Sequence, residues 1–191
     1  MREIALHLLD IAENSVAAEG KNISVHVLED LVQDRLTVSV IDDGRGMDAA
    51  TVEQVQDPFY TTRTTRSVGL GIPLLKLAAD QADGSFSLEA EPGKGAWVEA
   101  EFRHSHIDRM PLGDLSATFL TLLISHPQID WTFLYRVTGG NKDNREFLFE
   151  SADLKRELGD ISLTEPEVLT FLRGIFDEGI EEVALQTVPE S

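Results

Sequence analysis

Residues 57–76 read DPFYTTRTTRSVGLGIPLLK and contain the pattern on which the expected fold depends. Gly69 and Gly71 stand just before Pro73. Proline is favoured in the first turn of a helix, and glycine lets a ligand come close to the backbone. The pattern therefore predicts a helix over 72–81 whose unpaired N–H groups and positive dipole end face a phosphate.

The polar stretch before these glycines has no apolar periodicity, and we interpret it as a mobile lid over the phosphates. It holds four threonines, two arginines and one serine, namely Thr61, Thr62, Thr64, Thr65, Arg63, Arg66 and Ser67. Guanidinium and hydroxyl groups hydrogen-bond phosphate oxygens, and loops of this kind often carry function. A Gly-x-Gly before a helix is a weak signal alone, because a tight loop into a packing helix has the same pattern.

The composition is that of an ordinary globular chain and restricts the partners. The 191 residues are 42% hydrophobic, which suffices for the core of one or two small domains. There are 34 acidic against 16 basic residues, a net charge of −18. Nucleic acids and anionic membranes require a positively charged face, so we expect neither as a partner.

Targeting and redox signals are also missing from the sequence. It has no cysteine, which excludes disulfides and thiolate metal sites in this chain. No apolar run approaches the length of a membrane span, and the N-terminal stretch MREIALHLLD carries acids, unlike a signal peptide. We therefore expect a soluble cytoplasmic protein.

Residues 3–18 have apolar positions at helical spacing, which predicts a helix beside a polar strip of His7, Asp10 and Asn14. Two interpretations of the strip stay open. It is either a solvent-facing helix edge, or a carboxylate and an amide one turn apart that can orient a water and a hard cation.

Two segments rich in β-branched residues, 22–28 and 35–41, predict strands, and the second runs into the sequence DDGRGM at 42–47. An acid and two glycines after a buried strand let the backbone approach a flat ligand while Asp42 accepts a hydrogen bond from it. An ordinary Asp-Gly turn is the alternative. A short helix over 49–55 and the strands 85–90 and 97–102, joined by a hairpin turn, complete this part.

The order of these motifs resembles the ATP-binding domain of sensor histidine kinases, in the superfamily shared with DNA gyrase, the large heat-shock chaperone and the mismatch-repair protein MutL. The resemblance covers residues 1–103, which we take as the ATP-binding domain. It implies an α/β (α+β) two-layer sandwich, a mixed β-sheet with the helices 3–18 and 72–82 on one face. The expected ligands are ATP and Mg²⁺.

The resemblance also implies a role for each matching residue. Asn14 coordinates Mg²⁺, and Asp42 accepts a hydrogen bond from the adenine amine. Gly44, Gly46 and Met47 lie around the adenine ring. The expected lid and phosphate contacts are Phe59, Thr62, Arg63, Arg66, Gly69, Leu70 and Gly71.

Two positions depart from the family pattern. Members that hydrolyse ATP or phosphorylate serine carry a glutamate one turn before the asparagine, and here that position is Asp10. Asp10 can act through a water, and Glu13 is a second catalytic candidate, although it lies roughly 100° around the helix axis from Asn14. Ala96 stands where the superfamily usually has threonine, so one polar contact near adenine is missing.

The segment 106–112, HIDRMPL, resembles a histidine phosphoacceptor motif, with its acid two residues after the histidine instead of one. His106 is therefore a possible phosphoacceptor, and a linker with a capping histidine is the alternative. Sensor kinases carry their phosphoacceptor histidine on a helical hairpin before the ATP domain. No such hairpin precedes residue 1 of the printed sequence, so we expect a free-standing bacterial kinase-like protein.

Residues 104–191 predict helices over 113–125, 151–158 and 165–182 and strands over 131–137 and 145–149. We interpret them as a small C-terminal α/β extension that either completes the core or binds a protein partner.

Three functions remain open for the whole chain. It is a signalling phosphotransferase of the histidine or serine protein kinase type, an ATPase whose lid movement regulates a partner, or a nucleotide-binding regulator without turnover. The lid and hairpin sequences favour the first.

Overall fold

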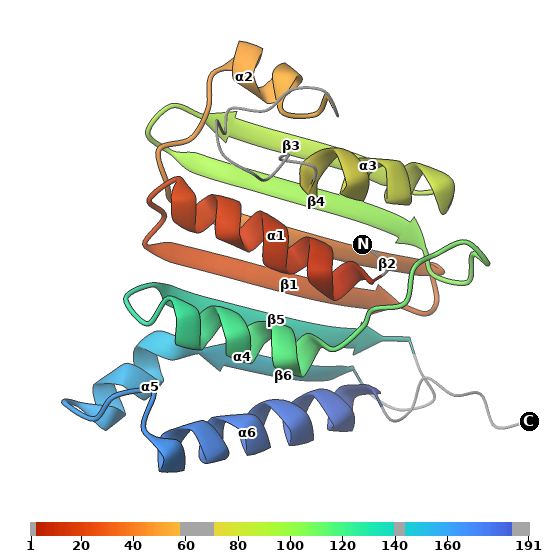
Figure 1. Ribbon diagram of the computed structural model, residues 1–191. Helices are drawn as coiled ribbons and strands as arrows, with labels where there is room; N and C mark the ends of the chain where they lie inside the picture. The colour runs from red at the N-terminus through yellow and green to blue at the C-terminus, as the bar shows by residue number, and fades with distance from the viewer. Residues whose placement is uncertain (1–2, 58–70, 140–143, 185–191) are drawn as a thin grey trace, which may run out of the picture.

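The computed structural model describes residues 3–57, 71–139 and 144–184 (Figure 1). In chain order, the elements are α1 (Ile4–Ala17), β1 (Asn22–Asp30), β2 (Arg35–Asp42), α2 (Ala49–Gln54), α3 (Gly71–Gln81), β3 (Ser85–Glu91), β4 (Gly95–Arg103), α4 (Leu115–Ser125), β5 (Asp130–Thr138), β6 (Arg145–Glu150), α5 (Ser151–Leu158) and α6 (Pro166–Ala184). Every predicted helix and strand is present, with ends shifted by a few residues.

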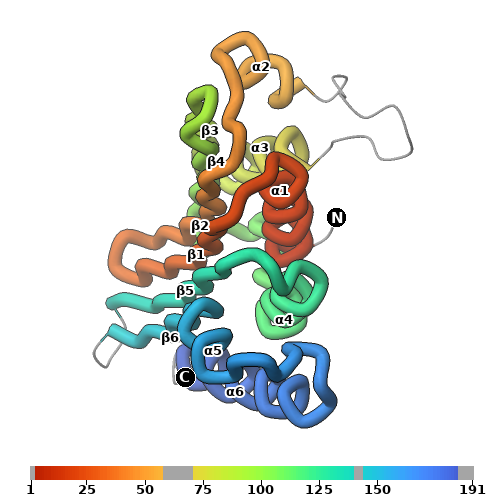
Figure 2. Tube along the Cα trace, turned by 90° about the vertical axis from the view of Figure 1, so that its left-hand side faces the viewer, coloured from red at the N-terminus to blue at the C-terminus, as the bar shows by residue number. Residues whose placement is uncertain are grey.

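The six strands form one mixed sheet in the order β3-β4-β2-β1-β5-β6. The β1–β5 pair is parallel, and the other described pairs are antiparallel. Helices α1, α3, α4 and α6 lie along the same side of the sheet, as Figure 2 shows. This arrangement confirms the predicted two-layer α/β sandwich.

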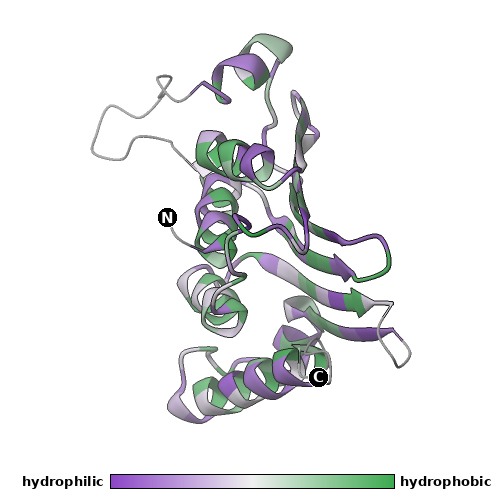
Figure 3. Ribbon diagram, turned by 90° about the vertical axis from the view of Figure 1, so that its right-hand side faces the viewer, coloured by the Kyte–Doolittle hydropathy of each residue, from purple (hydrophilic) through white to green (hydrophobic). Residues whose placement is uncertain are grey.

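Alternation along the strands decides which face the helices cover. In β1, Ile23, Val25 and Val27 are buried, while the residues between them are only half-buried. Period-two alternation of this kind places one apolar face on the core. The covering helices are amphipathic, with hydrophobic and hydrophilic residues interleaved along each in Figure 3.

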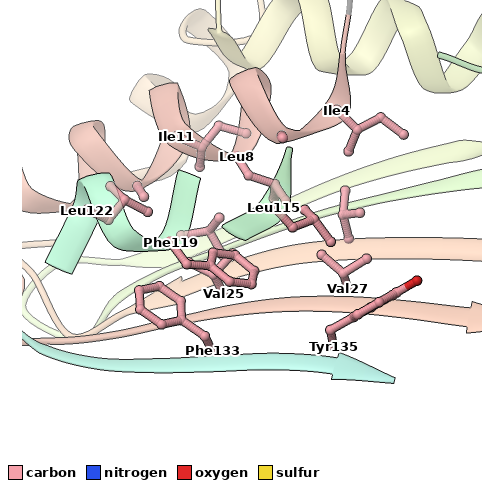
Figure 4. Packing of buried hydrophobic residues seen from close by; sticks show 14 of the residues in the cluster. Ile4, Leu8, Ile11, Val25, Val27, Leu115, Phe119, Leu122, Phe133 and Tyr135 are labelled. Carbon is pink, nitrogen blue, oxygen red and sulfur yellow. The ribbon is translucent and has the colours of Figure 1, made fainter. Parts of the chain in front are cut away.

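The core lies between this sheet face and the helices. Buried side chains of α1 and α4 point toward those of β1 and β5 (Figure 4). Phe119 of α4 stacks on Phe133 of β5 with ring centroids 4.5 Å apart, and Phe176 of α6 packs edge-on against Phe133. Aromatic pairs in these orientations add to the energy of area burial.

The C-terminal extension continues the same sheet. Strand β5 pairs with β1 from Asn22↔Asp130 to Asp30↔Thr138, so β1 is bonded on both sides. Residues of both sequence halves belong to one continuous hydrophobic cluster. The boundary near residue 103 therefore separates two stretches of sequence that share one core.

The buried acid Glu29, near the C-terminal end of β1, connects the N-terminal stretch of sequence to the extension. Glu29 is 5% exposed, and its carboxylate accepts a hydrogen bond of 2.6 Å from the Tyr135 hydroxyl and is bonded to His104 Nε2. Burial acts to raise the pKa of Glu29, but the hydrogen bonds from His104 and Tyr135 outweigh it and leave the pKa below its usual value of 4.5.

We expect the Glu29 carboxylate to make the fold acid-sensitive. A folded-state pKa below the unfolded value means that its stabilisation is present above pH 4.5 and is lost as the pH falls through the folded pKa. Glu29→Gln should lower the free energy of unfolding by ~1–3 kcal/mol at pH 7. The gap from wild type should narrow as the pH falls below 4.5, as measured by urea unfolding at several pH values.

Glu53→Gln, an exposed change on α2, is the control and should follow wild type at every pH. A gap between Glu29→Gln and wild type that is equal at pH 7 and pH 3 would contradict the assignment.

Candidate functional site

Four segments meet at one end of the sheet: the second half of α1, the turn after β2, the start of α3 and the β3–β4 hairpin. Ser15 of α1 bonds Asp42 of β2, and Asp10 of α1 packs on Gly71 of α3. Gly93 of the hairpin donates its N–H to the Arg45 carbonyl at 2.7 Å. The sequence-predicted residues of α1, β2 and α3 are thus brought together.

Asp42 ends β2 with a buried carboxylate held by two donors. Its Oδ2 accepts from Ser15 Oγ at 2.6 Å, and its Oδ1 accepts from the Gly44 N–H at 2.9 Å. The side chain is 8% exposed, so its orientation is fixed by these bonds. An acceptor held in this way can select a ligand that presents a donor.

Ser15 was not among the predicted site residues. It lies on the apolar row of α1 with Ile4, Leu8 and Ile11, and it is buried like them. A hydroxyl in an otherwise apolar buried row requires a hydrogen-bond partner, and this was the available signal.

Gly46, in the turn after Asp42, and Gly95, at the start of β4, each lie against the backbone of the other segment. At Gly46, φ is +63°, and a side chain there would overlap the carbonyl of Glu91 in the hairpin. At Gly95, φ is +86°, and a side chain would overlap the Asp42 carbonyl. The turn and the hairpin therefore pack backbone against backbone, which glycine alone permits at positive φ. Met47 beside them is half-buried and packs on the core.

Asp43, next to Asp42, hydrogen-bonds the start of β1. Its carboxylate accepts from the backbone N–H groups of Lys21 and Asn22 at 2.6 and 2.9 Å, and from Asn22 Nδ2 at 2.7 Å. Desolvation acts to raise the pKa of Asp43, but these bonds, led by those of Asn22, lower it overall. Asp43 thus ties the start of β1 to the end of β2.

Asp10 lies at the N-terminus of α3. A side chain in place of the Gly71 hydrogen would overlap Asp10 Oδ2, so the carboxylate is packed directly on the first residue of that helix. A negative charge is favourable at a helix N-terminus. Asn14, one turn further along α1, is half-buried.

Glu13, the second catalytic candidate, faces another neighbour. Its two carboxylate oxygens lie 2.9 and 3.0 Å from Nε2 of His126, the residue that caps α4. Of the two acids of α1, Asp10 therefore contacts the start of α3 and Glu13 contacts the end of α4. The His126 contact joins residues far apart in the chain and had no local sequence signal.

His106 lies away from this site. Its Nδ1 accepts from the Asp108 N–H at 3.2 Å, and its Nε2 is 3.5 Å from Asp83 Oδ2. In the β2–β4 register, Asp42 pairs with Ala96 and Arg35 with Arg103, so His106 follows the opposite end of the sheet. Seven strand residues separate the two ends by about 23 Å.

The remaining predicted residues, Phe59, Thr62, Arg63, Arg66, Gly69 and Leu70, lie outside the described residues.

The residues present fit a Mg²⁺ ion bound together with phosphates. Among the described residues, no three acids or histidines are grouped so as to hold a metal by themselves. Mg²⁺ typically takes one or two protein oxygens and completes its shell with water and phosphate oxygens. The amide oxygen of Asn14 suits this chemistry.

Within the described ranges of the chain, no helix has the length and apolar character needed to cross a membrane.

A buried acid at a strand end, a polar helix strip and a glycine-led helix start together define a nucleotide-binding α/β protein. The chain belongs to the histidine kinase-, DNA gyrase B-, and HSP90-like ATPase family, whose model matches residues 1–106.

Relatives and a solved structure extend this finding. Sporulation kinase C of Bacillus subtilis is 31% identical over 88 residues, 46% of this chain and 20% of that protein. Sensor protein kinase FleS of Pseudomonas aeruginosa is 38% identical over 88 residues, 46% of this chain and 22% of that protein. The chain thus spans about a fifth of the length of these relatives.

The crystal structure of the N-terminal domain of a DNA repair protein has a TM-score of 0.53 at 13% identity, over 78% of this chain and 52% of that one. That share is larger than residues 1–106, so the likeness in fold includes part of the C-terminal extension.

We expect Ser15→Ala to weaken the site by releasing Asp42. A buried carboxylate that loses one of two donors should lower the free energy of unfolding by ~1–3 kcal/mol. Thermal unfolding measures the loss, and Ser87→Ala, an exposed serine of β3, is the control. Equal melting temperatures of the two variants would rule out a supporting role for Ser15.

Proposed function

We propose that the chain binds Mg-ATP at this site and transfers its γ-phosphoryl group in signalling, as a protein kinase of the histidine or serine type. The observation that carries the proposal is the buried Asp42 carboxylate, oriented by Gly44 and by Ser15, the residue that follows Asn14 on α1. The relatives named as kinases support it.

Each predicted site residue in the described part of the chain has a role in this proposal. Asp42 accepts a hydrogen bond from the adenine amine, while Gly44, Gly46 and Met47 border the ring. The first turn of α3 at Gly71 offsets phosphate charge with its N–H groups. Asn14 holds Mg²⁺, which when bound neutralises charge on the phosphate oxygens. For the lid we retain the sequence-based roles of Phe59, Thr62, Arg63, Arg66, Gly69 and Leu70.

Asp10 is the described acid best placed to assist the transfer. Its position on Gly71 puts a carboxylate at the start of the helix that faces the phosphates. There it accepts the proton of the attacking hydroxyl or water as the γ-phosphoryl group leaves ADP. The same geometry favours a second candidate function, ATP hydrolysis coupled to lid movement.

The position of His106 restricts how it can serve as acceptor. It contacts Asp83, just beyond the C-terminal end of α3, whereas the phosphates are proposed at the first residue of that helix, about 16 Å away, so we propose that phosphate on His106 comes from a second copy of the chain. A partner protein would bind the extension, where Phe171 of α6 is 59% exposed.

We expect Asp42→Asn to lower the affinity for ATP and ADP roughly 30- to 100-fold. The amide presents a donor to the adenine amine, and a mismatched hydrogen bond to a charged group is worth about 2–3 kcal/mol. Calorimetric titration measures the change.

The matched control is Asp43→Asn, the same substitution one residue on, where the carboxylate binds β1 instead. It should keep affinity within roughly threefold of wild type. Equal losses in both variants would count against adenine recognition by Asp42.

The second test compares substitutions of the two acids of α1, Asp10 and Glu13, by the phosphate that each variant releases from ATP or transfers to protein. Pure protein is incubated with γ-labelled Mg-ATP, and label on protein and label in free phosphate are both measured. Asp10→Asn should lower the sum of the two by about 100-fold or more because it removes the base. Glu13→Gln, which changes the His126 contact, should keep it within roughly threefold.

The form of the product then distinguishes the functions. Acid-labile label on the protein that is absent in His106→Gln supports histidine phosphorylation, whereas free phosphate alone supports an ATPase. Equal effects of Asp10→Asn and Glu13→Gln would contradict the role of Asp10. Nucleotide binding without either product would refute turnover by the chain alone.

A further inference from the structure

The sheet has an open face on the side away from its main helices. Helices α1, α3, α4 and α6 lie together on one side, so the opposite face carries none of these four (Figure 2). Strand residues that alternate with the buried positions point to this open face. In β4 these are Trp97, Glu99 and Glu101, which alternate with the buried Val98 and Ala100. The Trp97 side chain is 45% exposed, so a large aromatic surface is left in contact with water.

The strand register gives Trp97 one apolar and two acidic neighbours. Ile41 of β2 pairs with Trp97 on one side, and the exposed Glu89 of β3 pairs with it on the other. Directly paired residues of antiparallel strands have Cβ atoms roughly 5 Å apart. Glu99 lies two residues along β4 on the same face. We call Ile41, Glu89, Trp97 and Glu99 together the Trp97 surface.

The two acids of the Trp97 surface have no basic partner within the described part of the chain. The ion pairs formed there include one between Arg35 and Glu101, but none involves Glu89 or Glu99. Burial, followed by the negative charges of Glu101 and Glu89, raises the pKa of Glu99. A positive group placed beside these carboxylates offsets their repulsion, so the surface is complementary in charge to a cationic partner.

A guanidinium group suits the Trp97 surface better than an ammonium group does. It stacks flat on an indole ring, its fork of N–H donors matches a carboxylate, and it is more weakly hydrated than an ammonium. Tryptophan and arginine are both enriched in protein–protein interfaces, and exposed apolar patches with polar rims mark such interfaces. The chemistry of this surface therefore favours an arginine side chain of another protein.

We propose that the Trp97 surface binds a protein partner through an arginine-bearing segment, whose guanidinium stacks on Trp97 and is held by Glu89 and Glu99. The surface lies within the residues that match the family model and is separate from the extension. It is at the end of the sheet that holds Asp42, on the face away from α1, so the partner binds behind the candidate nucleotide site. The proposal does not depend on nucleotide binding.

Tryptophan fluorescence reports on this surface in the unmodified protein. The chain has two tryptophans, and the second, Trp131, is 1% exposed, so a bound peptide can reach Trp97 alone. The probe is a synthetic peptide of alternating arginine and leucine, and its control carries glutamate in place of arginine. The arginine peptide should shift the emission of Trp97, and the glutamate peptide should leave it unchanged.

Substitutions that change the charge equally separate this site from general attraction, because a net charge of −18 attracts any basic peptide. Affinities for the arginine peptide are measured by calorimetry. Glu89→Gln and Glu99→Gln should each weaken binding roughly fivefold, and Trp97→Leu roughly tenfold.

The matched control is Glu150→Gln in β6. Glu150 is exposed in the same cross-strand row as Trp97, four strand spacings or about 19 Å away. Its substitution removes the same charge and should keep the affinity within roughly twofold of wild type.

Several results would overturn the proposal. They are no binding of the arginine peptide to wild type, binding without a change in Trp97 emission, equal losses in the three glutamate variants, or full binding by Trp97→Leu. Emission that changes with protein concentration alone would assign the surface to a second copy of the chain. Failure of acrylamide to quench Trp97 would show that the chain itself covers the surface, which also excludes the proposal.

Discussion

Strand β1 is hydrogen-bonded along its whole length to β2 on one side and to β5 on the other, and the rest of the structure depends on this double pairing. The first partner places Asp42 beside the start of β1, and the second brings the C-terminal extension into the same sheet. A parallel pair needs a long crossover connection, and here the chain between β1 and β5 contains β2, α2, α3, β3, β4 and α4. The family fold and the extension therefore share one sheet and one core.

Within this frame, neighbouring acids are separated by the geometry of the elements that carry them. Asp42 points into the core side of β2 and is held by Ser15, whereas Asp43 turns to the start of β1. Successive residues at the end of a strand face opposite directions, so the Asp42 carboxylate lies on the side of α1 while the Asp43 carboxylate joins the start of β1 to the end of β2. In this Asp-Asp-Gly sequence, Asp42 is therefore the candidate ligand-binding residue, and Asp43 stabilises the pairing of β1 with β2.

The sequence was sufficient for the elements and for the two-layer architecture. Periodicity locates α1 and the strands, and the motif order places Asp42, Asn14 and Gly71 at one end of the sheet. It was not sufficient for contacts between elements. Neither the Ser15–Asp42 bond nor the Glu13–His126 pair follows from local spacing, because their partners are 27 and 113 residues apart. Such pairings are decided by the packing of elements that are distant in the chain.

Helix α1 lies between α3 and α4, so it contacts both the helix of the proposed nucleotide site and the first helix of the extension (Figure 1). Asp10 and Glu13 are three residues apart, which is about 60° around a helix axis, enough for one to reach α3 and the other α4. Glu13 is adjacent to Asn14, so the bond from His126 holds the backbone that carries the proposed Mg²⁺ ligand. The Glu13–His126 pair therefore links the extension to the helix that carries Asp10 and Asn14.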